Sequence, residues 1–317
     1  MDASFANKAM IFLIWLMALT FCPSARVEAG CSEEQNRALL EIRNSTHGLL
    51  FADLDGSRDC CSKSNILCDD DGKVIRIFMQ DDYVKPPSIF KWYPNMTLFT
   101  LFNELDFLDL SSMNIGGELQ VSGMGNLPSS IFSNQSKITT FEVSGNRLEG
   151  VLSFSILANA SSLYHLDLSN NYELEIETES PSWVPTFQLR KLYLANCSLN
   201  KKNGHVVPTF ISTQYLLYSL DLSNSPLEGS VPCHLFFNTN ITKLLLSGNK
   251  IDGSFLDCSA NGTSPLEWLD ISGNHVKGHL PENIGYLLPN LYGVDMSSNA
   301  LEGNTFLGPL VIRLSNI

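Results

Sequence analysis

The chain has 317 residues, and its 33 aspartates and glutamates outnumber 20 lysines and arginines to give a formal net charge of −13 at pH 7. An apolar fraction of 44% with 17% charged residues is ordinary for a folded protein and excludes a disordered acidic chain. The negative charge argues against nucleic acid as a partner, and the length indicates two domains or an elongated architecture.

Residues 1–29 have the composition of a secretory signal peptide. Lys8 precedes an apolar run over residues 9–22, and the small-residue sequence Val-Glu-Ala at 27–29 predicts cleavage before Gly30. That run is shorter than the ~20 apolar residues that cross a bilayer, and the alternative is a signal anchor retained in the membrane. We therefore expect a secreted chain, extracellular or at the cell surface, and find no later run long enough to anchor it in a membrane.

Secretion decides how the cysteines and the Asn-x-Ser/Thr sequons are interpreted. In an oxidising compartment, the close spacing of Cys31, Cys60, Cys61 and Cys68 favours disulfides over a metal site. Sequons in a secreted chain predict a glycosylated surface. They stand at Asn44, Asn95, Asn134, Asn159, Asn196, Asn240 and Asn261.

Residues 30–97 are predicted to form an N-terminal cap, because their composition differs from that of residues 98–317. Ser32 with Gln35 three residues on indicates a capping box, and residues 38–42 give a helix an apolar face. Residues 74–77, Val-Ile-Arg-Ile, indicate a strand that closes the first turn of the next region. Repeat proteins need such a subdomain to cover their terminal face.

Residues 98–317 repeat one pattern, Leu-x-x-Leu-x-Leu-x-x-Asn-x-Leu, which is the leucine-rich-repeat signature. Its first, fourth and sixth residues point inward, and the Leu-x-Leu alternation is that of a short strand with one buried face. The predicted fold is an α/β leucine-rich-repeat solenoid, a horseshoe with a parallel β-sheet on its concave face. The repeats start near residues 105, 138, 163, 189, 217, 241, 266 and 291.

The repeats depart from the pattern in several places. The ninth residue is Met113, Cys197 or Ser225 where the others have asparagine, and an insertion over residues 118–126 predicts a loop outside the stack. No C-terminal cap follows, so we expect the last repeat, residues 291–310, to expose an apolar edge and to promote self-association. Cys233 and Cys258 stand at nearly equivalent places in adjacent repeats, which permits either a disulfide or two free buried thiols, whereas Cys197 is predicted to be a buried thiol.

The fifth residue of each repeat forms an acidic row on the concave face. We interpret these acids as structural, against the alternatives of a catalytic or Ca²⁺-binding row, because Leu-Asp-Leu-Ser is the usual strand sequence of such repeats. The row should still attract basic ligands. Six of its eight members are acids: Asp109, Glu142, Asp167, Tyr193, Asp221, Leu245, Asp270 and Asp295 stand there, with Tyr193 and Leu245 the two that are not.

The second and third residues of the middle repeats are more distinctive, because aromatic and arginine side chains are frequent where proteins grip partners. The alternative is that these are scattered surface aromatics without a role. We predict a ligand-binding surface formed by Tyr164, His165, Arg190, Lys191, Tyr193, Tyr218, Lys243, Leu245, Trp268 and Tyr292.

An enzymatic function finds no support in the sequence. It contains no G-x-S-x-G elbow, no H-E-x-x-H, no dinucleotide fingerprint and no phosphate loop. His275 and His279 flank a glycine turn rather than share a helix face. We predict no catalytic residues, no metal site and no cofactor.

The cap and the repeats together resemble the plant leucine-rich-repeat receptor-like proteins. The cap residues run from Cys31 through Cys60-Cys61 and Cys68 to Val74, and residues 227–232 and 276–281 match the plant-type continuation L-x-G-x-x-P. The resemblance implies disulfides Cys31–Cys60 and Cys61–Cys68. Lys63 replaces the family's usual tryptophan, which removes an aromatic anchor from the cap. Family members continue through more repeats, a C-terminal cap, a membrane span and a short tail, so the chain resembles a truncated member.

The resemblance implies an extracellular recognition module of plant defence, apoplastic or at the cell surface. Such a module binds a peptide, protein or pathogen-derived ligand on the concave face and signals only through partner receptor kinases. Two alternatives remain open. One is a secreted inhibitor of microbial cell-wall hydrolases, similar to the polygalacturonase inhibitors; the other is a truncated product without function.

Overall fold

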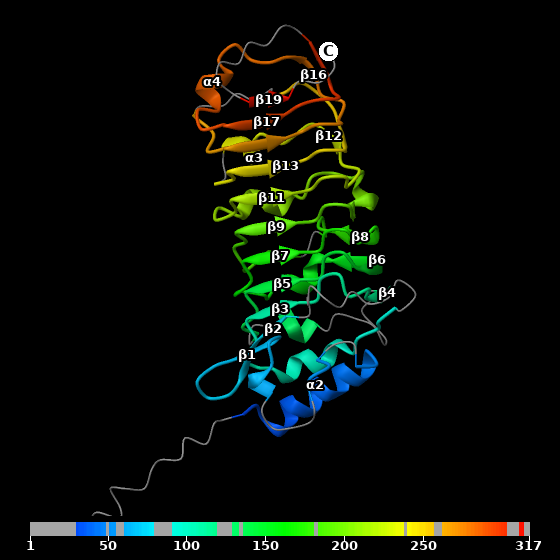
Figure 1. Ribbon diagram of the computed structural model, residues 1–317. Helices are drawn as coiled ribbons and strands as arrows, with labels where there is room; N and C mark the ends of the chain where they lie inside the picture. Colours follow the sequence, from blue (N-terminus) through cyan, green and yellow to red (C-terminus); the bar gives the residue numbers. More distant parts are fainter. Residues whose placement is uncertain are drawn as a thin grey trace, which may run out of the picture.

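The computed structural model describes residues 30–48, 51–54, 60–78, 91–118, 129–132, 136–180, 183–237, 240–256, 262–302 and 311–313. Figure 1 shows these residues as turns of chain stacked into an elongated column, with helix α2 at one end and strand β19 at the other. We call one turn of the repeat a rung. The stacking places an eleven-stranded sheet along the column, in the order β1-β2-β3-β5-β7-β9-β11-β13-β15-β17-β19.

Each rung adds one three-residue strand to this long sheet, and all neighbours are parallel except the antiparallel β1–β2 pair. The predicted repeats place the strands from β3 to β17 at their third to fifth residues. The strands are β1 (Ile66–Cys68), β2 (Val74–Phe78), β3 (Phe107–Asp109), β5 (Thr140–Glu142), β7 (His165–Asp167), β9 (Lys191–Tyr193), β11 (Ser219–Asp221), β13 (Lys243–Leu245), β15 (Trp268–Asp270), β17 (Gly293–Asp295) and β19 (Val311–Arg313).

Smaller sheets lie beside the long one, where the chain leaves each turn. A four-stranded sheet has the order β10 (Ser198–Leu199), β8 (Glu173–Glu177), β6 (Arg147–Ser153), β4 (Gly116–Glu118), and two pairs follow, β12 (Glu228–Gly229) with β14 (Lys250–Ile251) and β16 (Lys277–His279) with β18 (Ala300–Glu302). The helices are α2 (Glu33–Ser45), α3 (His234–Phe237), α4 (Ile284–Leu287), and the 3₁₀ turns η1 (Cys60–Ser62), η2 (Met96–Leu101), η3 (Ser129–Phe132), η4 (Phe154–Leu157), η5 (Lys201–Asn203) and η6 (Thr209–Thr213).

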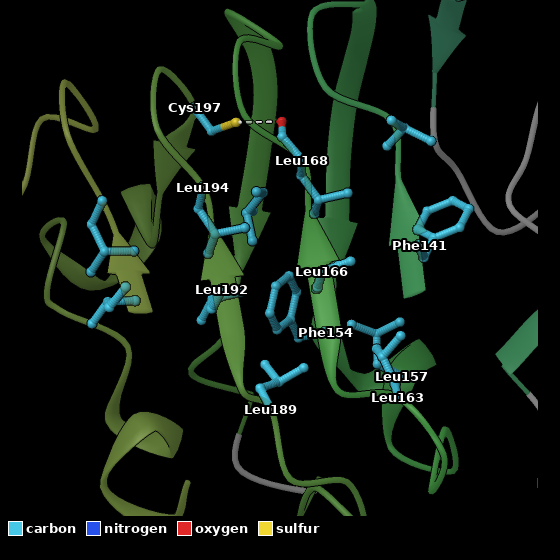
Figure 2. Packing of buried hydrophobic residues seen from close by; sticks show 14 of the residues in the cluster. Phe141, Phe154, Leu157, Leu163, Leu166, Leu168, Leu189, Leu192, Leu194 and Cys197 are labelled. Atoms are coloured by element: carbon cyan, nitrogen blue, oxygen red, sulfur yellow. Dashed lines mark hydrogen bonds between the residues drawn. The ribbon is translucent and has the colours of Figure 1, made fainter. Parts of the chain in front are cut away.

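The core is continuous along the column because each rung buries its leucines against the next. Leu166 and Leu168 of one rung pack beside Leu192 and Leu194 of the following rung, and all four are at most 1% exposed. Figure 2 shows Phe154, from a 3₁₀ turn behind the sheet, filling the space among these leucines. A single rung has too little apolar surface to offset the entropy of ordering its residues, so stability depends on neighbouring rungs.

The ninth residue of the repeat forms the predicted asparagine ladder. Asn171 donates through Nδ2 to the carbonyls of Leu168 (2.8 Å) and Val143 (3.1 Å) and accepts from the amide of Leu148 (3.1 Å). Where asparagine is missing, the contacts are fewer. Cys197 Sγ donates to the Leu168 carbonyl at 3.3 Å, and burial raises the pKa of this thiol to about 12, so it remains a donor.

The backbone of the eighth residue of each predicted repeat has the left-handed conformation, with positive φ. This explains why only glycine, asparagine and serine stand at that position. Glycine and asparagine adopt positive φ at little cost. The residues are Ser112, Gly145, Asn170, Asn196, Asn224, Gly248, Gly273 and Ser298, with φ between 52° and 67°.

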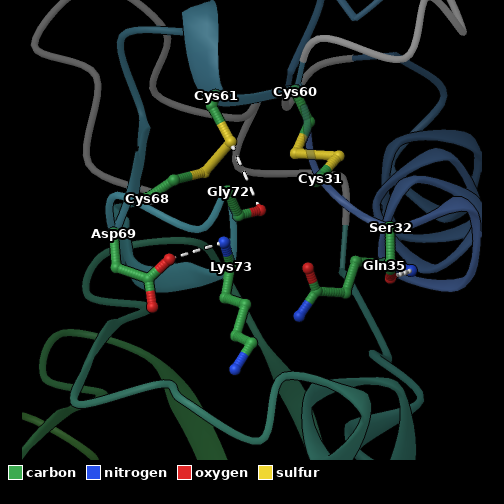
Figure 3. The surroundings of a disulfide bond; sticks show 9 residues. All are labelled: Cys31, Ser32, Gln35, Cys60, Cys61, Cys68, Asp69, Gly72 and Lys73. Atoms are coloured by element: carbon green, nitrogen blue, oxygen red, sulfur yellow. Dashed lines mark hydrogen bonds between the residues drawn. A yellow bond between two sulfur atoms is a disulfide. The ribbon is translucent and has the colours of Figure 1, made fainter. Parts of the chain in front are cut away.

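The cap forms at the N-terminal end through the two disulfides implied by the resemblance, Cys31–Cys60 and Cys61–Cys68 (Figure 3). Ser32 Oγ accepts from the Gln35 amide at 3.1 Å, but Gln35 Oε1 is buried without a partner, so only half of the predicted capping box forms.

Lys63, which replaces the family tryptophan, does not leave the cap open. Its side chain is only 15% exposed, and Nζ donates to the Asp53 carbonyl at 2.8 Å. Trp92 fills the cap from further along the chain: it is 2% exposed, and its Nε1 donates to Ser45 Oγ at 2.9 Å. The aromatic anchor is therefore supplied from a different position.

The far end of the column differs from the prediction. Residues 291–310 were expected to present an uncovered edge, but β19 pairs in parallel with β17, so β17 has a strand on both sides. The repeat frame missed β19 because it follows β17 after a spacing shorter than one repeat.

The signal peptide, Cys258, most of the predicted insertion and the sequons Asn134 and Asn261 lie outside the described residues. Within the described residues, none of the helices has the length and hydropathy of a membrane span.

Candidate functional site

The residues predicted to bind a ligand all lie on, or one residue before, six adjacent strands from β7 to β17. We call the solvent side of these strands, formed by the second, third and fifth residues of each rung, the open face. Tyr164, Arg190, Tyr218, Lys243, Trp268 and Tyr292 are exposed on it, whereas His165, Lys191, Tyr193 and Leu245 are half-buried. Parallel pairing puts the third residues in register, so the predicted residues form one continuous surface.

Several of these side chains support one another across rungs. The Arg190 guanidinium lies 5.8 Å from the centre of the Tyr164 ring, which is cation–π geometry. The rings of His165 and Tyr193 meet edge to face at 5.6 Å, and the Tyr193 hydroxyl lies 3.1 Å from Ser219 Oγ. The middle of the open face is therefore ordered by its own contacts, which lowers the entropy lost when a partner binds.

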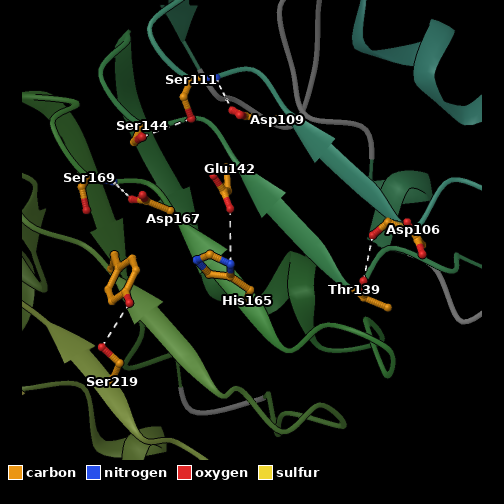
Figure 4. Close-up of polar contacts among 11 residues, drawn as sticks. Asp106, Asp109, Ser111, Thr139, Glu142, Ser144, His165, Asp167, Ser169 and Ser219 are labelled. Atoms are coloured by element: carbon orange, nitrogen blue, oxygen red, sulfur yellow. Dashed lines mark hydrogen bonds and ion pairs between the residues drawn. The ribbon is translucent and has the colours of Figure 1, made fainter. Parts of the chain in front are cut away.

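The acidic row has a structural role at most of its positions. Each aspartate accepts a hydrogen bond through Oδ1 from the amide two residues on and so closes the turn after its strand. Figure 4 shows two of these turns, at Asp109 with Ser111 and at Asp167 with Ser169. The same contact occurs at Asp221, Asp270 and Asp295. This geometry accounts for the repeated acids without catalysis or a metal.

Glu142 is the exception in this row. Its longer side chain contacts His165 on the next strand, with Oε1 3.3 Å from Nδ1 (Figure 4). Burial, together with the negative charges of Asp109 and Asp167, raises the pKa of Glu142 to about 7. Burial and the charge of Lys191 lower the pKa of His165 to about 4. Sequence reasoning treated Glu142 like its neighbours, although a glutamate among aspartates was a signal that the turn geometry differs.

This pair should make opposite contributions to the pH dependence of stability. Because the carboxyl pKa is raised in the folded chain, Glu142 contributes stability that is present below pH 4.5 and is lost as the pH rises through about 7. A lowered histidine pKa means that the His165 contribution is present above pH 6.5 and lost as the pH falls through about 4. Between pH 4.5 and 6.5 the pair carries one proton both folded and unfolded, so the two effects cancel.

Single substitutions should therefore separate the two pH dependences of stability, one caused by Glu142 and the other by His165. Relative to the wild type, His165→Gln should become less stable as the pH rises through this range, because only Glu142 then titrates abnormally. Glu142→Gln should become more stable over the same range. Thermal unfolding of the three proteins from pH 4 to 7.5 measures this, and slopes of the same sign in both variants would contradict the proposed pairing.

An aromatic pair marks the other end of the open face. Trp268 and Tyr292 are 39% and 62% exposed, and their ring centres lie 6.1 Å apart. Gly293 lies in register with Trp268, and a Cβ built on Gly293 would fall 2.2 Å from Trp268 Cε3. The indole therefore lies over bare backbone. Sequence reasoning missed Gly293; its signal was a glycine at the third position, where every neighbouring rung has a side chain.

The other predicted sites are placed as follows. Cys233 is disulfide-bonded, whereas Cys197 is a free buried thiol. Among the described sequons, Asn44, Asn95, Asn159 and Asn240 are exposed, while Asn196 is half-buried and donates to Asn170 Oδ1 at 2.7 Å. Within the described residues, the one group of side chains spaced to hold a metal is Cys60, Cys61 and Cys68, and disulfides already occupy these cysteines.

Comparison with known proteins agrees with this architecture. The Leucine Rich Repeat family model matches residues 265–287. Receptor-like protein 1 of Arabidopsis thaliana is 35% identical over 198 residues, which is 62% of this chain and 17% of that protein. Receptor-like protein 14 of the same plant is 38% identical over 157 residues (49% and 15%), and Cuscuta receptor 1 of Solanum lycopersicum is 29% identical over 174 residues (54% and 15%). The matches thus span less than a fifth of these relatives.

Solved structures show the same fold. A plant ice-binding protein superposes with a TM-score of 0.65 at 23% identity, covering 86% of this chain and 88% of that one, which shows the fold alone. The plant peptide hormone receptor RGFR1, solved in complex with RGF2, superposes with a TM-score of 0.50 at 28% identity, covering 65% and 30%. The cap disulfides, the plant-type rungs and these relatives together show a leucine-rich-repeat solenoid that resembles the plant leucine-rich-repeat receptor-like proteins.

Proposed function

We propose that this chain recognises a peptide or protein ligand outside the cell, on the open face of the long sheet, and that the signal passes to a partner receptor kinase. The observation that carries this proposal is the row of exposed aromatic and basic side chains. Tyr164, Arg190 and Tyr218 take no part in the core, yet they stand side by side on consecutive rungs. Buried interface hot spots are rich in these residue types.

Two further observations support it. The relatives include proteins named as receptors, and one superposed structure is a peptide hormone receptor in complex with RGF2. The aspartates of the same face use Oδ1 for turn closure, so the side chains that are wholly left to contact a partner are mainly the aromatic and basic ones.

A triple substitution tests the proposal. Peptides are first selected from a random displayed library on the wild-type chain, and their affinity is then measured for a chain with alanine at Tyr164, Arg190 and Tyr218. Each hot-spot truncation costs about 1–4 kcal/mol of binding free energy, so affinity should fall at least about a hundredfold. Far-ultraviolet circular dichroism should not change, because all three side chains are exposed.

The matched control carries alanine at Tyr93, Tyr172 and Tyr286, which are 58%, 73% and 68% exposed but lie outside the long sheet. This variant should bind as the wild type does. Equal affinities for all three proteins would refute recognition on the open face, and capture of a plant receptor kinase by the wild-type chain tests the signalling step.

A further inference from the structure

The most specific feature of the open face is a fixed, exposed indole. We call Trp268, Tyr292 and Gly293 the aromatic shelf. The Trp268 ring lies over Gly293 on the neighbouring strand, and any side chain there would displace it, since a Cβ would approach Cε3 to 2.2 Å. The Tyr292 ring stands at 59° to it. A large aromatic surface is thus held in place while 39% of Trp268 stays open to solvent.

Two acidic residues stand close to Trp268 in the sequence, Glu267 before it and Asp270 after it. Asp270 follows Trp268 by two residues on the same strand, so both point to the open face about 6.6 Å apart. Within the described residues, the hydrogen bonds to Asp270 come from Ser272 and end on Oδ1 (2.9 and 2.6 Å), which leaves Oδ2 for another donor. Glu267 is exposed one residue before Trp268.

A positively charged ligand group would fit best beside the acid that has no basic residue as its strand neighbour. Lys243 is in register with Trp268 on the other side of β15. Arg313 on β19 is in register with Asp295 in the backbone pairing of β17 and β19. Asp270 lies between Leu245 and Asp295, so its own strand neighbours add no positive charge.

We propose that the aromatic shelf and Asp270 bind an arginine side chain of the ligand. This rests on the proposed function and specifies the chemistry of one ligand residue. A planar guanidinium stacks on an indole face and is attracted by its quadrupole, while its N–H fork pairs with a carboxylate; an ammonium offers no such plane. The net charge of −13 further favours a positive group.

The probe for this inference is the pentapeptide Gly-Gly-Arg-Gly-Gly, acetylated and amidated so that guanidinium is its single charge. The same peptide with citrulline keeps the shape and removes the charge. Titration followed by nuclear magnetic resonance and by tryptophan fluorescence should show the arginine peptide binding the full chain about tenfold more tightly. A lysine peptide should fall between the two.

Matched variants locate the binding. Trp268→Leu should lower affinity for the arginine peptide about three- to thirtyfold, the range of a partly desolvated cation–π contact. Asp270→Asn keeps the turn acceptor and should lower affinity by a similar factor. Gly293→Ala should lower it by displacing the indole, while Lys243→Ala should raise it by removing a like charge. Tyr286→Leu, an exposed tyrosine on α4, should have no effect.

Equal affinity for the arginine and citrulline peptides, or unchanged binding to both Trp268→Leu and Asp270→Asn, would overturn the inference. The proposed function is judged separately. Library peptides without arginine that still require Tyr164, Arg190 and Tyr218 would overturn the arginine site and leave recognition on the open face intact.

Discussion

Phe154→Ala should destabilise the chain by about 3–5 kcal/mol, the cost of removing a fully buried aromatic ring and leaving a cavity. The Phe154 side chain is 0% exposed and lies among leucines of adjacent rungs (Figure 2). Its ring also contacts Trp183 at 6.3 Å and Phe210 at 5.6 Å, from the following rungs. Because one ring joins neighbouring rungs, its loss weakens both interfaces.

Urea unfolding of the chain measures this change. Phe154→Leu is the conservative variant and should recover most of the stability, since it retains much of the volume. Tyr172→Ala removes an aromatic ring that is 73% exposed and should change the free energy of unfolding by less than about 0.5 kcal/mol. If Phe154→Ala were as mild as Tyr172→Ala, packing of the 3₁₀ turns would not hold the rungs together.

Asn171→Ala should cost about 2–4 kcal/mol, although it removes no apolar surface. The amide of Leu148 would lose its acceptor, and the carbonyl of Leu168 would keep only the Cys197 thiol. Each buried group left without a good partner costs roughly 1–3 kcal/mol. The side chain is 0% exposed, so water does not replace the lost hydrogen bonds.

The matched control is Cys197→Ala, at the same ladder position one rung on. Cys197 makes only longer contacts, at 3.3 and 3.8 Å, so its loss should cost about 1 kcal/mol. Thermal and urea unfolding of both variants gives the comparison. Equal costs would mean that ladder hydrogen bonds do not stabilise the turns more than simple burial does.

Much of the fold was predictable from local patterns. The spacing of Leu163, Leu166 and Leu168 predicts an inward-facing strand, and Asn171 after them predicts a buried amide, because both follow from the period of one turn. The left-handed eighth residues follow the same logic, since glycine and asparagine are tolerated there. Strand β19 escaped prediction because its spacing is shorter than a repeat, and Trp92 because nothing local connects it to Ser45.

The candidate site was predictable in position but not in detail. Tyr164, Arg190 and Trp268 stand at frame positions that must face solvent, so the sequence alone places them on one surface. The separate behaviour of Glu142, by contrast, depends on the distance to His165 and on burial between two aspartates. No pattern along the chain carries those quantities.

The sequence by itself determined the rung: which residues turn inward, which asparagine closes the turn and which cysteines belong to the cap. These depend on interactions within one repeat period, and a repeating pattern records them eight times over. Only the tertiary structure decided what happens between rungs, such as the indole of Trp268 over Gly293 and the contact of Glu142 with His165. Those contacts join residues about 25 positions apart, and their energies depend on distances and burial that exist only after the rungs have stacked.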